Sequence, residues 1–166
     1  KIILEAFGLS ETDIAPEHLR LDQATARMRE GTVDAFFFVG GYPTGAISEL
    51  ASSAGIELVP IAGTEAKKIL ADFKFFGPDK VPAGTYKDVG EVETISVNAL
   101  WVTSAKQPEN LVYGITKAIW NDNSRKLLDA GHAKGKVIRK ETALDGVGIP
   151  LHPGAAKFYK EAGLLK

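Results

Sequence analysis

The chain has 166 residues, of which 45% are hydrophobic, and 20 basic residues nearly balance 21 acidic ones, for a net charge of −1. This length and composition predict a globular domain with a real core, while the interspersed charges exclude a basic nucleic-acid footprint and an acidic tail. The absence of cysteine excludes disulfides, thiolate chemistry and the commonest structural zinc ligands, and no apolar run approaches the ~18–20 residues of a membrane-spanning helix.

The first predicted elements are helical. Residues 2–7 have the pattern of the last turns of a helix that ends at Gly8, although nothing in the chain precedes them to cap that helix. Asp22 is a suitable N-cap for a second helix over residues 23–30, which Gly31 ends. We therefore expect the chain to start inside an element and to pass through a short helix before its first strand.

Residues 33–50 predict the centre of the fold. Residues 33–39 are apolar except at one position and favour a strand buried on both faces, and Gly40 and Gly41 allow a sharp turn. Pro43 suits the first position of the helix that follows, which Gly55 ends. A helix N-terminus fronted by glycine at the carboxyl end of a strand is an anion-binding place. The alternative is a tight strand-to-helix turn that binds nothing.

The next segments repeat the alternation of strand and helix. Residues 57–61 predict a short strand, and Thr64 predicts the cap of a helix that carries Ile69, Leu70 and Phe73. Alternating strands and helices are typical of an α/β protein with a mainly parallel sheet, which is the fold class that we expect.

A composition change follows. Residues 75–89 contain Gly77-Pro78, Pro82 and Gly84 and predict a loop. Residues 91–103 alternate apolar and polar side chains and predict a long strand that links two lobes, with Thr94, Ser96 and Asn98 facing a cleft. The alternative is an ordinary half-exposed strand.

The last third of the chain is predicted to be helical. A helix follows Pro108, the run of residues 121–123 ends it and begins another, and the basic stretch over residues 131–140 reads as a solvated surface. The last helix opens at Pro153 and ends before Gly163, with His152 at its edge.

Catalytic and metal sites find little support in the residues. His18, His132 and His152 are scattered, and no pair has the spacing of metal ligands on one helix. The glycines at 40–45 lack the pattern of a nucleotide-binding loop, and no Gly-x-Ser-x-Gly elbow is present. We therefore expect a binding protein with no cofactor and no metal, and we expect Trp101 and Trp120 to be core residues.

Four segments follow one another along the chain: GTVDAFFFVGGYP, VPAGTYKDVGEVETISVNALWVTS, NLVYGITKAIW and LHPGAAKFYKEAG. In this order they resemble the C-terminal half of the TAXI family of TRAP-transporter solute receptors. The resemblance implies a type II periplasmic-binding-protein architecture, in which two α/β lobes close over a small ligand. Residues 1–90 then correspond to the second, ligand-binding lobe without its first strand. Residues 91–166 correspond to the lobe-crossing strand and to C-terminal helices that return to the first lobe.

The resemblance also implies a function without enzymatic activity. It predicts a periplasmic or otherwise extracytoplasmic receptor that hands a small carboxylate, such as glutamate, glutamine or another organic acid, to a membrane TRAP permease. The resemblance further predicts that the chain has a protein partner, either the missing N-terminal half of the receptor or a second copy of the chain. Two alternatives stay open, an enzyme on the same bilobal fold and a ligand-sensing interaction domain. The ligand-binding residues that the resemblance implies are Gly40, Gly41, Tyr42, Pro43, Thr44, Thr85 and Tyr86.

Overall fold

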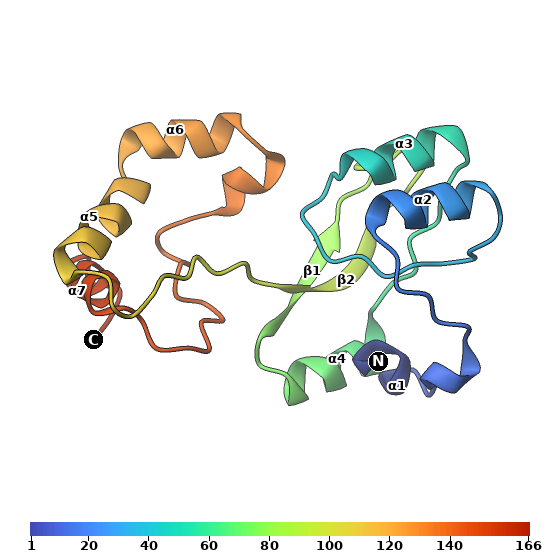
Figure 1. Ribbon diagram of the computed structural model, residues 1–166, viewed down its shortest axis with the longest axis horizontal. Helices are drawn as coiled ribbons and strands as arrows, with labels where there is room; N and C mark the ends of the chain where they lie inside the picture. Colours follow the sequence, from blue (N-terminus) through green and yellow to red (C-terminus); the bar gives the residue numbers. More distant parts are fainter. The chain divides into compact units, whose positions relative to one another are not determined.

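An antiparallel hairpin organises the first part of the chain in the computed structural model, which describes residues 1–166 (Figure 1). Strand β1 (Phe76–Val81) pairs with β2 (Val92–Val97), with Phe76 opposite Val97 and Val81 opposite Val92. These two strands form the only sheet. The chain divides into two compact units, Lys1–Val97 and Asn98–Lys166, and each is described by itself.

Helices make up most of the remaining regular structure. Unit 1 contains α1 (Ile2–Ala6), the 3-10 helix η1 (Glu11–Asp13), α2 (Leu21–Arg29), α3 (Gly45–Ser53) and α4 (Gly63–Asp72). Unit 2 contains α5 (Glu109–Ile119), α6 (Asp122–Ala130), the 3-10 helix η2 (Ala133–Val137) and α7 (Pro153–Glu161).

The core of unit 1 lies between one face of the hairpin and α3. Val81 and Val92, which are opposite each other in the hairpin, pack in one cluster with Ile47 and Ala51 of α3. Leu50, also on α3, is only 1% exposed. Because the side chains of a strand alternate between its two faces, the neighbouring pair of Lys80 and Glu93 points to the opposite face. In Figure 1, α2 and α3 lie on one side of the hairpin, and α1 and α4 lie on the other.

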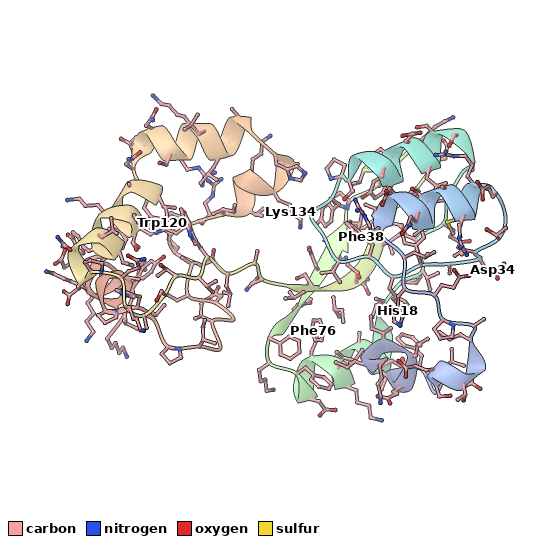
Figure 2. The ribbon with its side chains drawn as sticks, viewed as in Figure 1. His18, Asp34, Phe38, Phe76, Trp120 and Lys134 are labelled. Carbon is pink, nitrogen blue, oxygen red and sulfur yellow. The ribbon has the colours of Figure 1, made fainter.

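Three aromatic rings pack together where α4 leads into β1. Phe73 follows α4, and its ring centroid lies 6.4 Å from that of Phe76, at the start of β1. The Phe75 ring packs against that of Phe76, which Figure 2 labels, with centroids 4.6 Å apart. Edge-to-face and tilted pairs at these separations are favourable. The three rings therefore fix the sharp passage from α4 into β1.

The strands predicted over residues 33–39 and 57–61 are wrong. Neither segment belongs to a ladder, and Phe37, Val39 and Val59 are 63%, 80% and 78% exposed. One backbone hydrogen bond joins the second segment to the hairpin: the Ile61 N–H donates to the Glu93 carbonyl oxygen of β2 at 3.1 Å. A strand buried on both faces needs neighbours at both edges and layers above and below. A two-stranded sheet supplies neither, so the apolar runs stay unpaired.

The mainly parallel sheet is also wrong, since the one sheet is antiparallel. Residues 75–89, predicted as a loop, contain β1, and Pro78 is tolerated because β1 is an edge strand that needs no further N–H. The turn uses Gly84 at φ +74° and Asp88 at φ +60°. The strand predicted over 91–103 is β2 and ends at Val97; beyond it Trp101 is 77% exposed rather than a core residue.

Three predicted helix starts differ by one or two positions. The N-cap of α2 is Arg20 rather than Asp22, because the Arg20 N–H donates to the Gln23 side chain. The N-cap of α3 is Thr44, so Pro43 lies just outside the helix and follows a cis peptide bond. The N-cap of α4 is Ala62, which places Thr64 inside the first turn. Each segment is helical as predicted, and only its boundary moves.

Unit 2 is held by the packing of α5 against α7, and its helices agree with the prediction. Asn121 caps α6 by accepting the Ser124 N–H, and His152 caps α7 by accepting the Gly154 N–H through Nδ1. Trp120 is half-buried rather than a core residue, and its indole N–H donates to the Tyr159 hydroxyl at 3.1 Å. The basic stretch forms η2 and is mostly exposed.

Candidate functional site

Two segments that the sequence predicted separately meet at the start of α3. The Thr44 N–H donates to the Tyr86 hydroxyl, with 3.1 Å between nitrogen and oxygen, although 42 residues separate them in the chain. Tyr86 is 5% exposed, and its ring belongs to the same cluster as Ile47 of α3. The buried ring therefore holds the β1–β2 turn against the entry to α3.

Tyr42 fixes the same segment to the hairpin. Its hydroxyl lies 2.7 Å from the Lys80 carbonyl oxygen and 3.1 Å from Asp79 Oδ1, so its single hydrogen is shared between two acceptors on β1. The ring packs against the core cluster of unit 1. Residues 40–44 are thus attached to the hairpin at both Tyr42 and Thr44.

The two threonine hydroxyls close local turns. Thr44 Oγ1 donates to the Gly41 carbonyl oxygen at 2.8 Å, and Thr85 Oγ1 donates to the Pro82 carbonyl oxygen at 2.7 Å. A hydroxyl that satisfies a backbone carbonyl in this way stabilises the turn. Each oxygen keeps lone pairs, but the hydrogen of each hydroxyl is already engaged.

Gly40 and Gly41 are exposed at the surface. A Cβ on Gly40 would lie 2.5 Å from an atom of the Phe38 ring, so any other residue there requires that ring to move. Figure 2 labels Phe38 in the extended segment that precedes the glycines. The glycines thus leave the two positions before Tyr42 without side chains.

The N-terminus of α3 carries an uncompensated positive end. The helix begins at Gly45 with no side-chain cap, and its first turn contains no acidic residue. By contrast, α4 has Glu65 in its first turn. Because the first N–H groups of a helix and its dipole favour negative charge, α3 presents the more receptive of these two helix starts to an anion.

Sequence reasoning missed Asp79 and Lys80. Both fell in the predicted loop, yet β1 places Asp79 against the Tyr42 hydroxyl and Lys80 Nζ 3.0 Å from Glu91 Oε1 and 3.5 Å from Glu93 Oε1. The hydrogen bond and charge of Glu91, followed by those of Glu93, raise the pKa of Lys80. The pairing of β1 with β2 would have located both residues. Pro78 and Pro82 made this segment resemble a loop, so the strand was not predicted.

The site offers no obvious metal chemistry. No group of three or more histidine, cysteine, aspartate or glutamate side chains is placed to hold a metal ion. Two of the three histidines, His132 and His152, instead accept backbone N–H groups at the starts of η2 and α7. His152 therefore lies at the edge of the last helix as predicted.

The comparison with known families points to a class of protein. The NMT1-like family matches residues 1–163, so the chain belongs to that family. The family is periplasmic-binding-protein-like and is related to substrate-binding proteins, typically extracytoplasmic ones. It is a family of binding proteins and not of enzymes, and membership supports a solute-binding function in general. None of the helices combines the length and apolarity that a membrane crossing requires.

Proposed function

We propose that the chain is part of an extracytoplasmic solute receptor of the TAXI type, which binds a small carboxylate and delivers it to a TRAP-type permease. The candidate ligands are glutamate, glutamine and other organic acids. Membership of a solute-binding family supports the general class, and the resemblance of four sequence segments supports the narrower type. The carboxylate-binding residues are proposed to be those around the start of α3.

The observation that carries the proposal is the contact between Thr44 and Tyr86. The resemblance implies Thr44 as a ligand-binding residue, but its N–H and its hydroxyl both donate to protein acceptors in the structure. The Tyr86 oxygen accepts from Thr44, so its own hydrogen is available for donation. A carboxylate in front of α3 is therefore proposed to accept from the Tyr86 hydroxyl and from the Gly45 N–H.

The magnitudes are consistent with a receptor that needs further contacts. Two hydrogen bonds to a charged oxygen contribute about 1.5–3 kcal/mol each, and the helix dipole adds about 0.3–1 kcal/mol. Their sum is roughly 3–7 kcal/mol, whereas micromolar affinity requires about 8 kcal/mol. The start of α3 thus provides much of the affinity, and other groups in the complete binding cleft are proposed to supply the remainder.

Adding a negative charge at the start of α3 tests the proposal. A thermal-shift screen of amino acids and organic acids first identifies a stabilising ligand, since a ligand at 100 times its Kd adds about 2.7 kcal/mol. Thr44→Glu should then abolish binding in calorimetry, because a fixed carboxylate occupies the start of α3 and repels the ligand. Thr44→Ser is the matched control, and it should bind nearly as well because the N–H groups and the hydroxyl remain.

Two results would contradict the proposal. Wild-type affinity in Thr44→Glu would place the anion elsewhere and leave residues 40–44 as a tight turn. A screen in which no amino acid or organic acid raises the melting temperature would remove the carboxylate altogether. Circular dichroism of both variants confirms that the fold survives.

A further inference from the structure

A groove lies on the face of the hairpin that is turned away from the core cluster. Its volume is about 470 Å³, and α4 forms one wall while β1 and β2 form the other. Ala66 and Gly63 face it from α4, and their small size keeps the helix from filling the space. Small-molecule sites commonly occupy about 300–1,000 Å³, so the groove is large enough for a ligand.

The hairpin wall carries a net negative charge. Lys80 and Glu93 line the groove, and Lys80 Nζ lies 3.0 Å from Glu91 Oε1 and 3.5 Å from Glu93 Oε1. One ammonium group between two carboxylates leaves an excess of one negative charge. A second cation at this wall is therefore electrostatically favourable. Of the two carboxylates, only that of Glu93 belongs to a residue that lines the groove.

The helix wall is positive. Lys67 lines the groove from α4 and takes part in none of the ion pairs of the structure. Its neighbour Lys68 is exposed and does not line the groove. An anionic group at this wall thus gains a cation that no protein carboxylate already neutralises.

Between the two charged walls the lining is apolar. Leu70 of α4 and Ile95 of β2 contribute to it, together with Ile61 and Pro78. From these features we infer that the groove binds a short apolar peptide with free termini, its carboxylate at Lys67 and its ammonium group at Glu93. A dipeptide of two apolar residues spans about 7 Å in extended form and brings two apolar side chains to this lining between its charged ends.

Blocked peptides test the inference directly. Calorimetry compares leucyl-leucine with its N-acetyl and C-amide derivatives, which lack the ammonium group and the carboxylate respectively. Leucyl-leucine should bind, and each blocked form should bind about tenfold more weakly because one charge-assisted contact is lost. Equal affinity for all three peptides, or no binding of leucyl-leucine at millimolar concentration, overturns the inference.

Two adjacent lysines provide a matched pair of variants. Lys67→Gln should weaken leucyl-leucine about tenfold and leave the affinity for the C-amide unchanged, since that peptide has no carboxylate to lose. Lys68→Gln, one residue along the same helix, should change neither affinity. Equal losses in the two variants, or an equal loss for both peptides in Lys67→Gln, overturn the placement of the carboxylate.

A variant on the opposite wall completes the test. Glu93→Gln should weaken leucyl-leucine and the C-amide by the same factor and leave the N-acetyl peptide unaffected. An unchanged affinity for leucyl-leucine would contradict the placement of the ammonium group. Because the groove and the start of α3 lie on opposite faces of the hairpin, peptide binding neither requires nor excludes carboxylate binding at Tyr86.

Discussion

The two units of the chain are stabilised in different ways. In unit 2, α5 and α7 are complete helices that pack side by side, and each begins and ends at signals within its own sequence. In unit 1, the decisive contacts join backbone segments that are not regular elements, as between Thr44 and Tyr86 or between Tyr42 and Lys80. A helix satisfies its hydrogen bonds internally, whereas an extended segment depends on what lies beside it. The stability of unit 1 therefore depends on a few side chains that span long sequence separations.

The largest expected effect tests the helix packing of unit 2. A Cβ on Gly154 would overlap the Glu109 carbonyl oxygen and lie 2.6 Å from the Tyr113 nitrogen, so Gly154→Ala forces α7 away from α5. We expect the free energy of unfolding to fall by about 1–3 kcal/mol. Urea unfolding followed by Trp120 fluorescence measures it, because Trp120 contacts Tyr159 of α7.

Gly114 of α5 is the matched control for that substitution. Apart from the adjoining residues and backbone of α5 itself, no atom lies within 4 Å of the Cβ that Gly114→Ala adds, so this change should stabilise α5 by about 0.5–1 kcal/mol. A loss of similar size at both glycines would mean that close helix contact does not distinguish them.

An intermediate effect tests the join in unit 1. Tyr86→Phe keeps the buried ring but removes the acceptor of the Thr44 N–H, and we expect a loss of about 1 kcal/mol. Urea unfolding followed by amide NMR signals of α3 measures it. Tyr113→Phe is the control from unit 2, where the hydroxyl bonds only to exposed Glu161, and it should change stability less. A larger loss at Tyr113 would reverse the comparison between the units.

The smallest expected effect concerns pH. Arg125 donates to both oxygens of Asp129, at 3.0 and 2.8 Å, and this holds the pKa of Asp129 below its ordinary value of 3.8. A carboxyl group whose pKa is lower in the folded state stabilises the fold above its ordinary pKa, and that contribution is lost as pH falls through the lowered value.

Asp129→Asn should therefore flatten the acid part of the stability curve of unit 2 without altering unit 1. The change should be small, because both side chains are partly exposed to solvent. Fluorescence-monitored urea unfolding between neutral and acidic pH checks this expectation. Parallel curves for the variant and the wild-type protein would contradict it.

The helices were predictable from sequence because their signals are local. Gly8, Asn121 and Pro153 mark helix ends that the structure confirms. The strands were predictable only in part: β2 lies within the strand expected over residues 91–103, whereas residues 33–39 have the composition of a buried strand but no neighbour to pair with. Conversely, Gly77 and Pro78 hid β1, whose pairing with β2 tolerates them only because β1 is an edge strand.

The candidate site could be located from sequence but not described in detail. The glycines and Pro43 placed a helix start correctly to within two residues, and the resemblance added Thr85 and Tyr86. That Tyr86 reaches Thr44 rather than standing open follows from the path of the hairpin, which no local pattern encodes. Asp79 was missed for the same reason, since only strand pairing brings it to Tyr42.

The unpaired segment before the glycines also bears on how the protein behaves at high concentration. Residues 35–39 read AFFFV, five consecutive apolar residues without charge or proline, and Val39 is 80% exposed. Such a composition favours edge-to-edge pairing between molecules and the growth of stacked β-aggregates. Asp34 at one end and two glycines at the other keep the run short, so these flanking residues protect the colloidal stability of the chain as well as shaping its turn.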